Sequence, residues 1–118
     1  MHKYGKIWGT TGELFRCNNV IVSKIVVKAG GTCSRHKHSS KFNYFFVEHG
    51  ELLISVWKND YDLVDKTLLG PGESCTVSPG EFHSFTATVD TEALEIYWVE
   101  ISNNDIIRDG CGSVHEQS

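Results

Sequence analysis

Short runs of β-branched and aromatic residues, separated by glycine, proline and asparagine, make up most of the chain. This pattern is typical of strands joined by tight turns. The last run, Ala93–Val99, alternates apolar and polar residues, as a strand with two different faces does. No stretch carries an apolar helical repeat with convincing caps. We therefore predict an all-β sandwich or barrel, with strands at residues 19–27, 42–47, 51–57, 66–69, 74–77, 83–88 and 93–99.

Size and charge narrow the class of protein. The 118 residues weigh 13.2 kDa, which suits a single domain over residues 1–118 with one core. Eleven basic and fifteen acidic residues give a formal charge of −4 without a basic stripe, so we expect no nucleic acid and no membrane partner. Neither a membrane span nor a signal peptide is visible. We therefore expect a cytoplasmic protein, with a flexible polar tail at residues 108–118.

The four cysteines are widely and irregularly spaced, and none forms a Cys-x-x-Cys pair. A structural zinc knuckle is therefore not predicted. We expect free thiols, some of them buried as small apolar side chains. They are Cys17, Cys33, Cys75 and Cys111.

Three of the six histidines have the spacing of a metal site. In a strand, residues two apart share a face, so His36 and His38 are expected to point the same way. Their imidazoles, about 6–7 Å apart along the chain, could converge on one cation. His83 follows a tight turn at Pro79-Gly80, and a closed barrel could bring it against the first pair. The other three, His2, His49 and His115, are expected at the surface.

At these residues the chain resembles the cupin superfamily. The first cupin motif is a Gly, then His-x-His, usually a Glu, and six residues later a Gly; residues 31–50 have this form. Residues 72–83 resemble the second motif, including its Gly-x-x-His ending. The start, Lys6-Ile7-Trp8-Gly9, is similar to the cupin domain of type II mannose-6-phosphate isomerases. The resemblance covers roughly residues 6–100 and implies a small jelly-roll barrel, with the motifs within about residues 18–100.

The resemblance also implies a metal centre. His36, His38 and His83 would bind a divalent transition metal (Fe, Mn, Zn or Ni), with Asn43 as a further candidate ligand. Asn43 stands where the family usually has its metal-binding Glu. Three imidazoles and an amide leave the site at about +2 instead of +1, which favours an anionic ligand. The alternative is a cupin that has lost its metal, with these histidines hydrogen-bonded in a polar pocket.

Three functions are compatible with such a site. The first is a metal-dependent isomerase or epimerase, in which the ion polarises a carbonyl of a sugar, sugar phosphate or similar small anionic metabolite. The second is an iron dioxygenase, since three-histidine iron sites occur among cupins. The third is a binding or regulatory protein without turnover. The superfamily hosts all three, so the fold does not choose among them.

Further residues complete the hypothesis. Glu81 beside the second motif is a candidate general base. Glu95 and Tyr97 share a face of the last strand, and the sequence leaves open whether this face points inward. An apolar wall of the cavity is predicted from side chains that share faces with Asn43 and His83, although they could equally be plain core: Phe45, Val47 and Phe85. Exposed strand edges and large residues on both faces of the last strand favour a homodimer.

Overall fold

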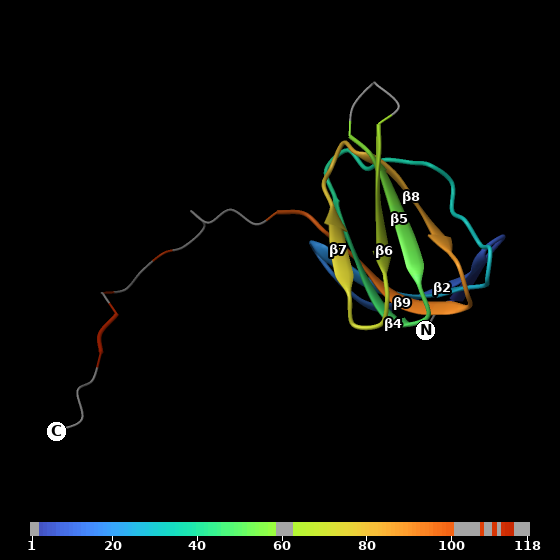
Figure 1. The fold of residues 1–118 in the computed structure, drawn as a ribbon. Coiled ribbons are helices and arrows are strands. Elements are labelled where there is room, and N and C mark those ends of the chain that lie inside the picture. The colour runs from blue at the N-terminus through green and yellow to red at the C-terminus, as the bar shows by residue number, and fades with distance from the viewer. Residues whose placement is uncertain (1–2, 59–62, 101–106, 108–109, 111, 115–118) are drawn as a thin grey trace.

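Nine antiparallel strands in two sheets form the part of the chain that the computed structural model describes, which excludes residues 1–2, 59–62, 101–106, 108–109, 111 and 115–118. The six-stranded sheet has the order β1-β2-β3-β9-β4-β7, and the three-stranded sheet has the order β6-β5-β8 (Figure 1). The strands are β1 (Lys3–Lys6), β2 (Gly9–Cys17), β3 (Val20–Val27), β4 (Phe42–His49), β5 (Leu52–Trp57), β6 (Val64–Leu69), β7 (Ser74–Val77), β8 (Phe82–Ala87) and β9 (Thr91–Trp98).

The prediction of an all-β fold is confirmed. Each of the seven predicted strands occurs as one of β3 to β9, with boundaries within two residues of those expected. The hairpin of β1 and β2 was not predicted, because its glycines and polar residues weaken the strand pattern. The pairing of β2 with β3 stabilises this hairpin, which its own sequence indicates only weakly.

The segment around His36 differs from the strand that was expected. Residues 28–41 form no named strand, and Thr32 and His36 make only isolated bridges, to Thr86 and His83 of β8. The backbones of His36 and His83 exchange two hydrogen bonds, of 3.0 and 2.8 Å. This local pairing fixes the segment against β8 without extending the sheet.

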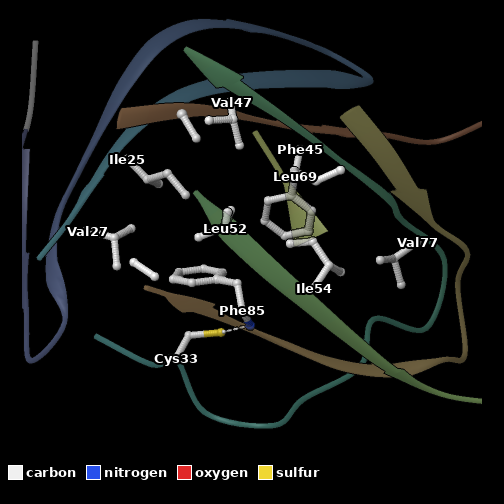
Figure 2. Packing of buried hydrophobic residues seen from close by; sticks show 12 residues of the cluster. Ile25, Val27, Cys33, Phe45, Val47, Leu52, Ile54, Leu69, Val77 and Phe85 are labelled. Carbon is white, nitrogen blue, oxygen red and sulfur yellow. Dashed lines mark hydrogen bonds between the residues drawn. The ribbon is translucent and has the colours of Figure 1, made fainter. Parts of the chain in front are cut away.

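The core lies between the two sheets and has an apolar end and a polar end. Along β4 the inward positions run from Val47 to Phe45 to Asn43, and the burial of β4 alternates accordingly. On β8 the same change runs from Phe85 to His83. Figure 2 shows the apolar end, where the buried cluster contains Ile25, Val27, Cys33, Phe45, Val47, Leu52, Ile54, Leu69, Val77, Phe85, Ala87 and Ala93. The inward side chains of β4 and of β8 therefore change from apolar to polar along each strand.

Two sequence expectations concern the rest of the chain. Among the described residues there is no helix, and hence none long and apolar enough to cross a membrane. The polar tail at residues 108–118 lies largely outside the described residues, and so does Cys111. Of the described cysteines, Cys17, Cys33 and Cys75 are free thiols, as expected.

Candidate metal centre and cavity

His36, His38 and His83 meet at the polar end of the barrel. One ring nitrogen from each lies within 4.8 Å of the others. The ring centroids are 4.5 Å apart for His36 and His83, 5.1 Å for His36 and His38, and 5.4 Å for His38 and His83. The structure thus brings the three predicted ligands together, although two come from a loop and one from β8.

Hydrogen bonds to the backbone orient two of these rings. His36 Nδ1 lies 2.7 Å from the carbonyl oxygen of Ser34, and His83 Nδ1 lies 3.0 Å from that of Glu81. Because a carbonyl oxygen only accepts, each Nδ1 carries the hydrogen and donates it. The lone pair is then on Nε2, the arrangement that backbone partners commonly impose on metal-binding histidines.

The cluster contains buried ring nitrogens that nothing in the described part of the chain satisfies. His38 Nε2 and His83 Nε2 are buried without a hydrogen-bond partner there. Burial lowers the pKa of His38 to about 4, with a smaller contribution from the charge of His36. Burial also lowers the pKa of His83. Both effects favour the neutral imidazole, which is the form that binds a metal ion. The residues present therefore fit a transition metal.

Asn43 is fully buried on β4 and pairs with Tyr97, whose ring centroid lies 5.1 Å from that of His38. Its Nδ2 donates a hydrogen bond of 3.2 Å to Glu95 Oε2, and its Oδ1 has no partner in the described part of the chain. Glu95 lies on β9, next to β4, where Asn43 pairs with Tyr97 and Phe45 pairs with Glu95. Asn43 thus binds a carboxylate of the neighbouring strand through its amide instead of supplying one itself. This also answers the open question about β9, since Glu95 and Tyr97 face inward.

Glu95 is only 8% exposed. Burial raises its pKa from 4.5 to about 7, although a hydrogen bond from Tyr97 and the charges of Lys41 and Lys6 oppose the rise. Burial and the charge of Glu95 raise the pKa of Tyr97, which keeps its hydroxyl protonated as a donor. A carboxyl group that titrates near neutral pH can both accept and return a proton.

A cavity of about 380 Å³ adjoins the cluster, within the range of small-molecule sites. Hydroxyl groups, one carboxylate, one ammonium group and aromatic rings line it. Its lining residues are Lys6, Trp8, Thr11, Ser23, Cys33, Ser34, His36, Phe85, Glu95 and Tyr97. Cys33 is held at the wall, because its Sγ accepts a 3.2 Å hydrogen bond from the Phe85 amide (Figure 2), and burial raises the pKa of its thiol to about 11.

The remaining predicted residues are distributed differently. Phe85 lines the cavity, whereas Phe45 and Val47 are not among its lining residues; all three belong to the buried apolar cluster. Glu81 does not line the cavity, and its carboxylate accepts hydrogen bonds from Lys58 Nζ at 2.9 Å and the Ser78 amide at 3.1 Å.

The sequence analysis did not single out Lys6, Trp8 or Thr11 as cavity residues. They come from the N-terminal hairpin, whose strand pattern is weak. The sequence feature that could have indicated this part of the cavity is Trp8, a large aromatic residue between two strands.

A two-sheet β-barrel with three histidines that could hold a metal ion at one end is the class of protein that this geometry defines. The family comparison agrees, because the cupin domain family matches residues 23–100. The chain belongs to the cupin family. A search of curated proteins by sequence gives no match.

Solved structures with this fold have little sequence identity to the chain. KdgF from Halomonas sp. superposes with a TM-score of 0.73 at 11% identity, over 87% of this chain and 90% of that one. Oxalate decarboxylase from Bacillus subtilis superposes with a TM-score of 0.73 at 16% identity, over 83% of this chain but only 27% of its own. The cupin domain of Schizosaccharomyces pombe Cnp3 gives a TM-score of 0.71 at 10% identity, over 85% of this chain and 69% of that one.

These comparisons bear on the fold. At such identities the likeness shows the fold alone. A further structure of the Bacillus subtilis decarboxylase, with 17% identity and a TM-score of 0.73, is described as having Mn(II) centres. The cupin family and the three-histidine cluster of this chain support a divalent transition metal, of unspecified identity, as its cofactor.

Proposed function

We propose that the protein is a metal-dependent enzyme of the isomerase or epimerase type that acts on a sugar, a sugar phosphate or a similar small anionic metabolite. One observation carries the proposal: the Glu95 carboxylate opens onto the same cavity as His36 of the histidine cluster. A metal-ligand set beside a carboxyl group suits proton transfer next to a carbonyl. Glu95 replaces Glu81 as our candidate base.

Several residues of the chain have separate roles in such a reaction. When bound, a divalent metal supplies Lewis-acid polarisation of a substrate carbonyl. Glu95 accepts the proton from the adjacent carbon and returns it to the neighbouring position. Asn43 and Tyr97 hold the Glu95 carboxylate by hydrogen bonds and leave its other lone pairs for the substrate. The hydroxyl groups of Ser23 and Thr11 are placed to bind substrate hydroxyls.

Deuterium exchange tests this function directly. The protein loaded with Mn²⁺, Zn²⁺, Ni²⁺ or Fe²⁺ is incubated in D₂O with aldose and ketose phosphates and with uronates. NMR should show deuterium entering at the carbon next to the carbonyl, and Glu95→Gln should lower the exchange rate at least a hundredfold while keeping the metal. Oxygen uptake that requires Fe²⁺ would instead establish the dioxygenase. Binding of these compounds without exchange would establish a non-catalytic role; either result would overturn the proposal.

We also propose that His36, His38 and His83 are the metal ligands. Elemental analysis should find about one metal ion per wild-type chain and much less for His83→Ala. The exposed His49 provides the matched control, because His49→Ala removes an imidazole at the end of β4 outside the cluster. Equal metal loss in both variants, or none in either, would refute the assignment.

We propose that two copies form a homodimer through the outer face of the six-stranded sheet. The strand register aligns an apolar row across four strands of this face: Phe15, Val22, Ile96 and Tyr44. Phe15 remains 56% exposed in the single chain. A contiguous apolar face of this kind is a common site of isologous contact. Light scattering at micromolar concentration should give a dimer, and Phe15→Ser a monomer. A monomeric wild type would contradict the proposal.

A cytoplasmic location also stays a prediction.

A further inference from the structure

Lys6 lies at the cavity through a hairpin that is fixed against the barrel. In the turn between β1 and β2, the Trp8 carbonyl accepts a 3.0 Å hydrogen bond from the Lys28 amide. Gly9 pairs with Val27, and a Cβ added at Gly9 would collide with the carbonyl oxygen of Val26. This close approach requires glycine and holds the hairpin in place. The position of Lys6 is therefore determined by the fold, although its side chain is exposed.

The charge of Lys6 is available to a ligand. None of the described carboxylates lies within 4.0 Å of its ammonium group. The cavity is lined by one carboxylate, that of Glu95, and by one lysine, Lys6. A second lysine, Lys41, lies close by, with its Nζ 4.7 Å from the centroid of the Tyr97 ring. The chain is acidic overall, yet this cavity has cationic groups at its margin and a metal-ligand cluster beside it.

The strand order separates Lys6 from Asn43, which pairs with Tyr97, whose ring packs against His38 of the cluster. β9, which carries Glu95, lies between β1 on one side and β4 on the other in the six-stranded sheet. Lys6 on β1 and Asn43 on β4 therefore flank Glu95 from opposite sides. At about 4.8 Å per strand, the backbones of β1 and β9 lie roughly 14 Å apart along the sheet, and the Lys6 side chain spans part of this separation, since it lines the same cavity as Glu95. A ligand that reaches from the histidine cluster past Glu95 to Lys6 must carry its anionic group several carbon atoms from the carbonyl.

We propose that Lys6 binds the carboxylate or phosphate of the substrate, and that the substrate is a sugar acid or sugar phosphate whose anionic group is remote from its carbonyl. This inference rests on the proposed function and assigns its specificity to the N-terminal hairpin. The ring of Trp8, held edge-on to Phe85 at 5.0 Å and 82°, adds an apolar surface for the carbon skeleton. Neutral sugars lack the group that Lys6 would bind.

Equilibrium binding tests the inference without requiring turnover. Calorimetry on the Mn²⁺-loaded protein compares glucuronate, glucose 6-phosphate and glucose. We expect at least one of the two anions to bind at least tenfold more tightly than glucose, and Lys6→Met to remove most of that preference while leaving glucose binding unchanged. The preference should weaken as ionic strength rises. Carboxylate and phosphate ligands are distinguished by which of the two anions binds more tightly.

Lys66→Met is the matched control, because it removes an exposed lysine from β6, in the other sheet. It should leave all three affinities unchanged. The inference is overturned if glucose binds as tightly as the anions, or if Lys6→Met leaves the anion preference intact. Failure of deuterium exchange with preserved anion binding would count against the proposed reaction, but not against the role of Lys6.

Discussion

Replacing Glu95 by Gln should stabilise the metal-free protein at neutral and alkaline pH. The folded state raises the pKa of this buried carboxyl from 4.5 to about 7. Between these values the folded protein holds a proton that the unfolded chain has released, so stability falls as pH rises from about 4.5 to 7 and is level above. One pKa unit corresponds to about 1.4 kcal/mol, so the free energy of unfolding falls by about 3 kcal/mol over this pH range. Gln keeps a hydrogen-bonding side chain of the same size without the charge.

Urea unfolding from pH 4.5 to 9, with a chelator present, measures this effect. The difference in the free energy of unfolding between Glu95→Gln and the wild type should grow with pH by about 3 kcal/mol and reach a plateau near pH 8. Glu92→Gln removes a carboxylate from the outer side of the same strand, where that side chain is 46% exposed, and should show no such trend. A pH-independent difference for Glu95→Gln would refute the argument that burial governs this carboxyl group.

Three further predictions concern other parts of the structure. Asn43→Glu should tighten divalent metal binding at least tenfold, measured by competition with a chromophoric chelator. The metal-free variant should lose about 2 kcal/mol of unfolding free energy, because a second carboxyl group then lies against Glu95. Unchanged metal affinity would mean that Asn43 does not face the metal. Gly50→Ala should cost more than 2 kcal/mol, since Gly50 has a φ of +92° and an added Cβ would collide with the Asp90 carbonyl oxygen. Gly72→Ala, with a φ of +81° and open space around it, should cost only about 1 kcal/mol in the same urea titration. Iodoacetamide at pH 8 should label the exposed Cys17 quickly and spare Cys33 and Cys75, because burial raises the pKa values of these two thiols to about 11. Peptide mass spectrometry measures the labelling, and fast labelling of Cys33 would show that the cavity wall opens.

Local patterns were sufficient for most of the fold. The strands from β3 to β9 were predictable because each is a short run containing β-branched or aromatic residues, bounded by turn residues. The histidines could be identified because residues two apart on an extended segment share a side whether or not that segment joins a sheet. This is why the grouping of His36 and His38 occurs although the segment is a loop with isolated bridges.

The tertiary structure decided what surrounds the histidines. Residue 43 lacks the carboxylate that the family usually places there, and only the pairing of β4 with β9 reveals that Glu95 lies within hydrogen-bond distance of Asn43. Alternation places Glu95 and Tyr97 on one face of a strand, but which face is buried depends on the sheet that packs against it. Lys6 and Trp8 reach the cavity through a hairpin whose order comes from pairing with β3. The sequence by itself determined the strands β3 to β9 and the common side of His36 and His38, which depend on neighbours along the chain. The acid, the lysine and the cavity depend on contacts between distant strands, and only the folded chain brings these together.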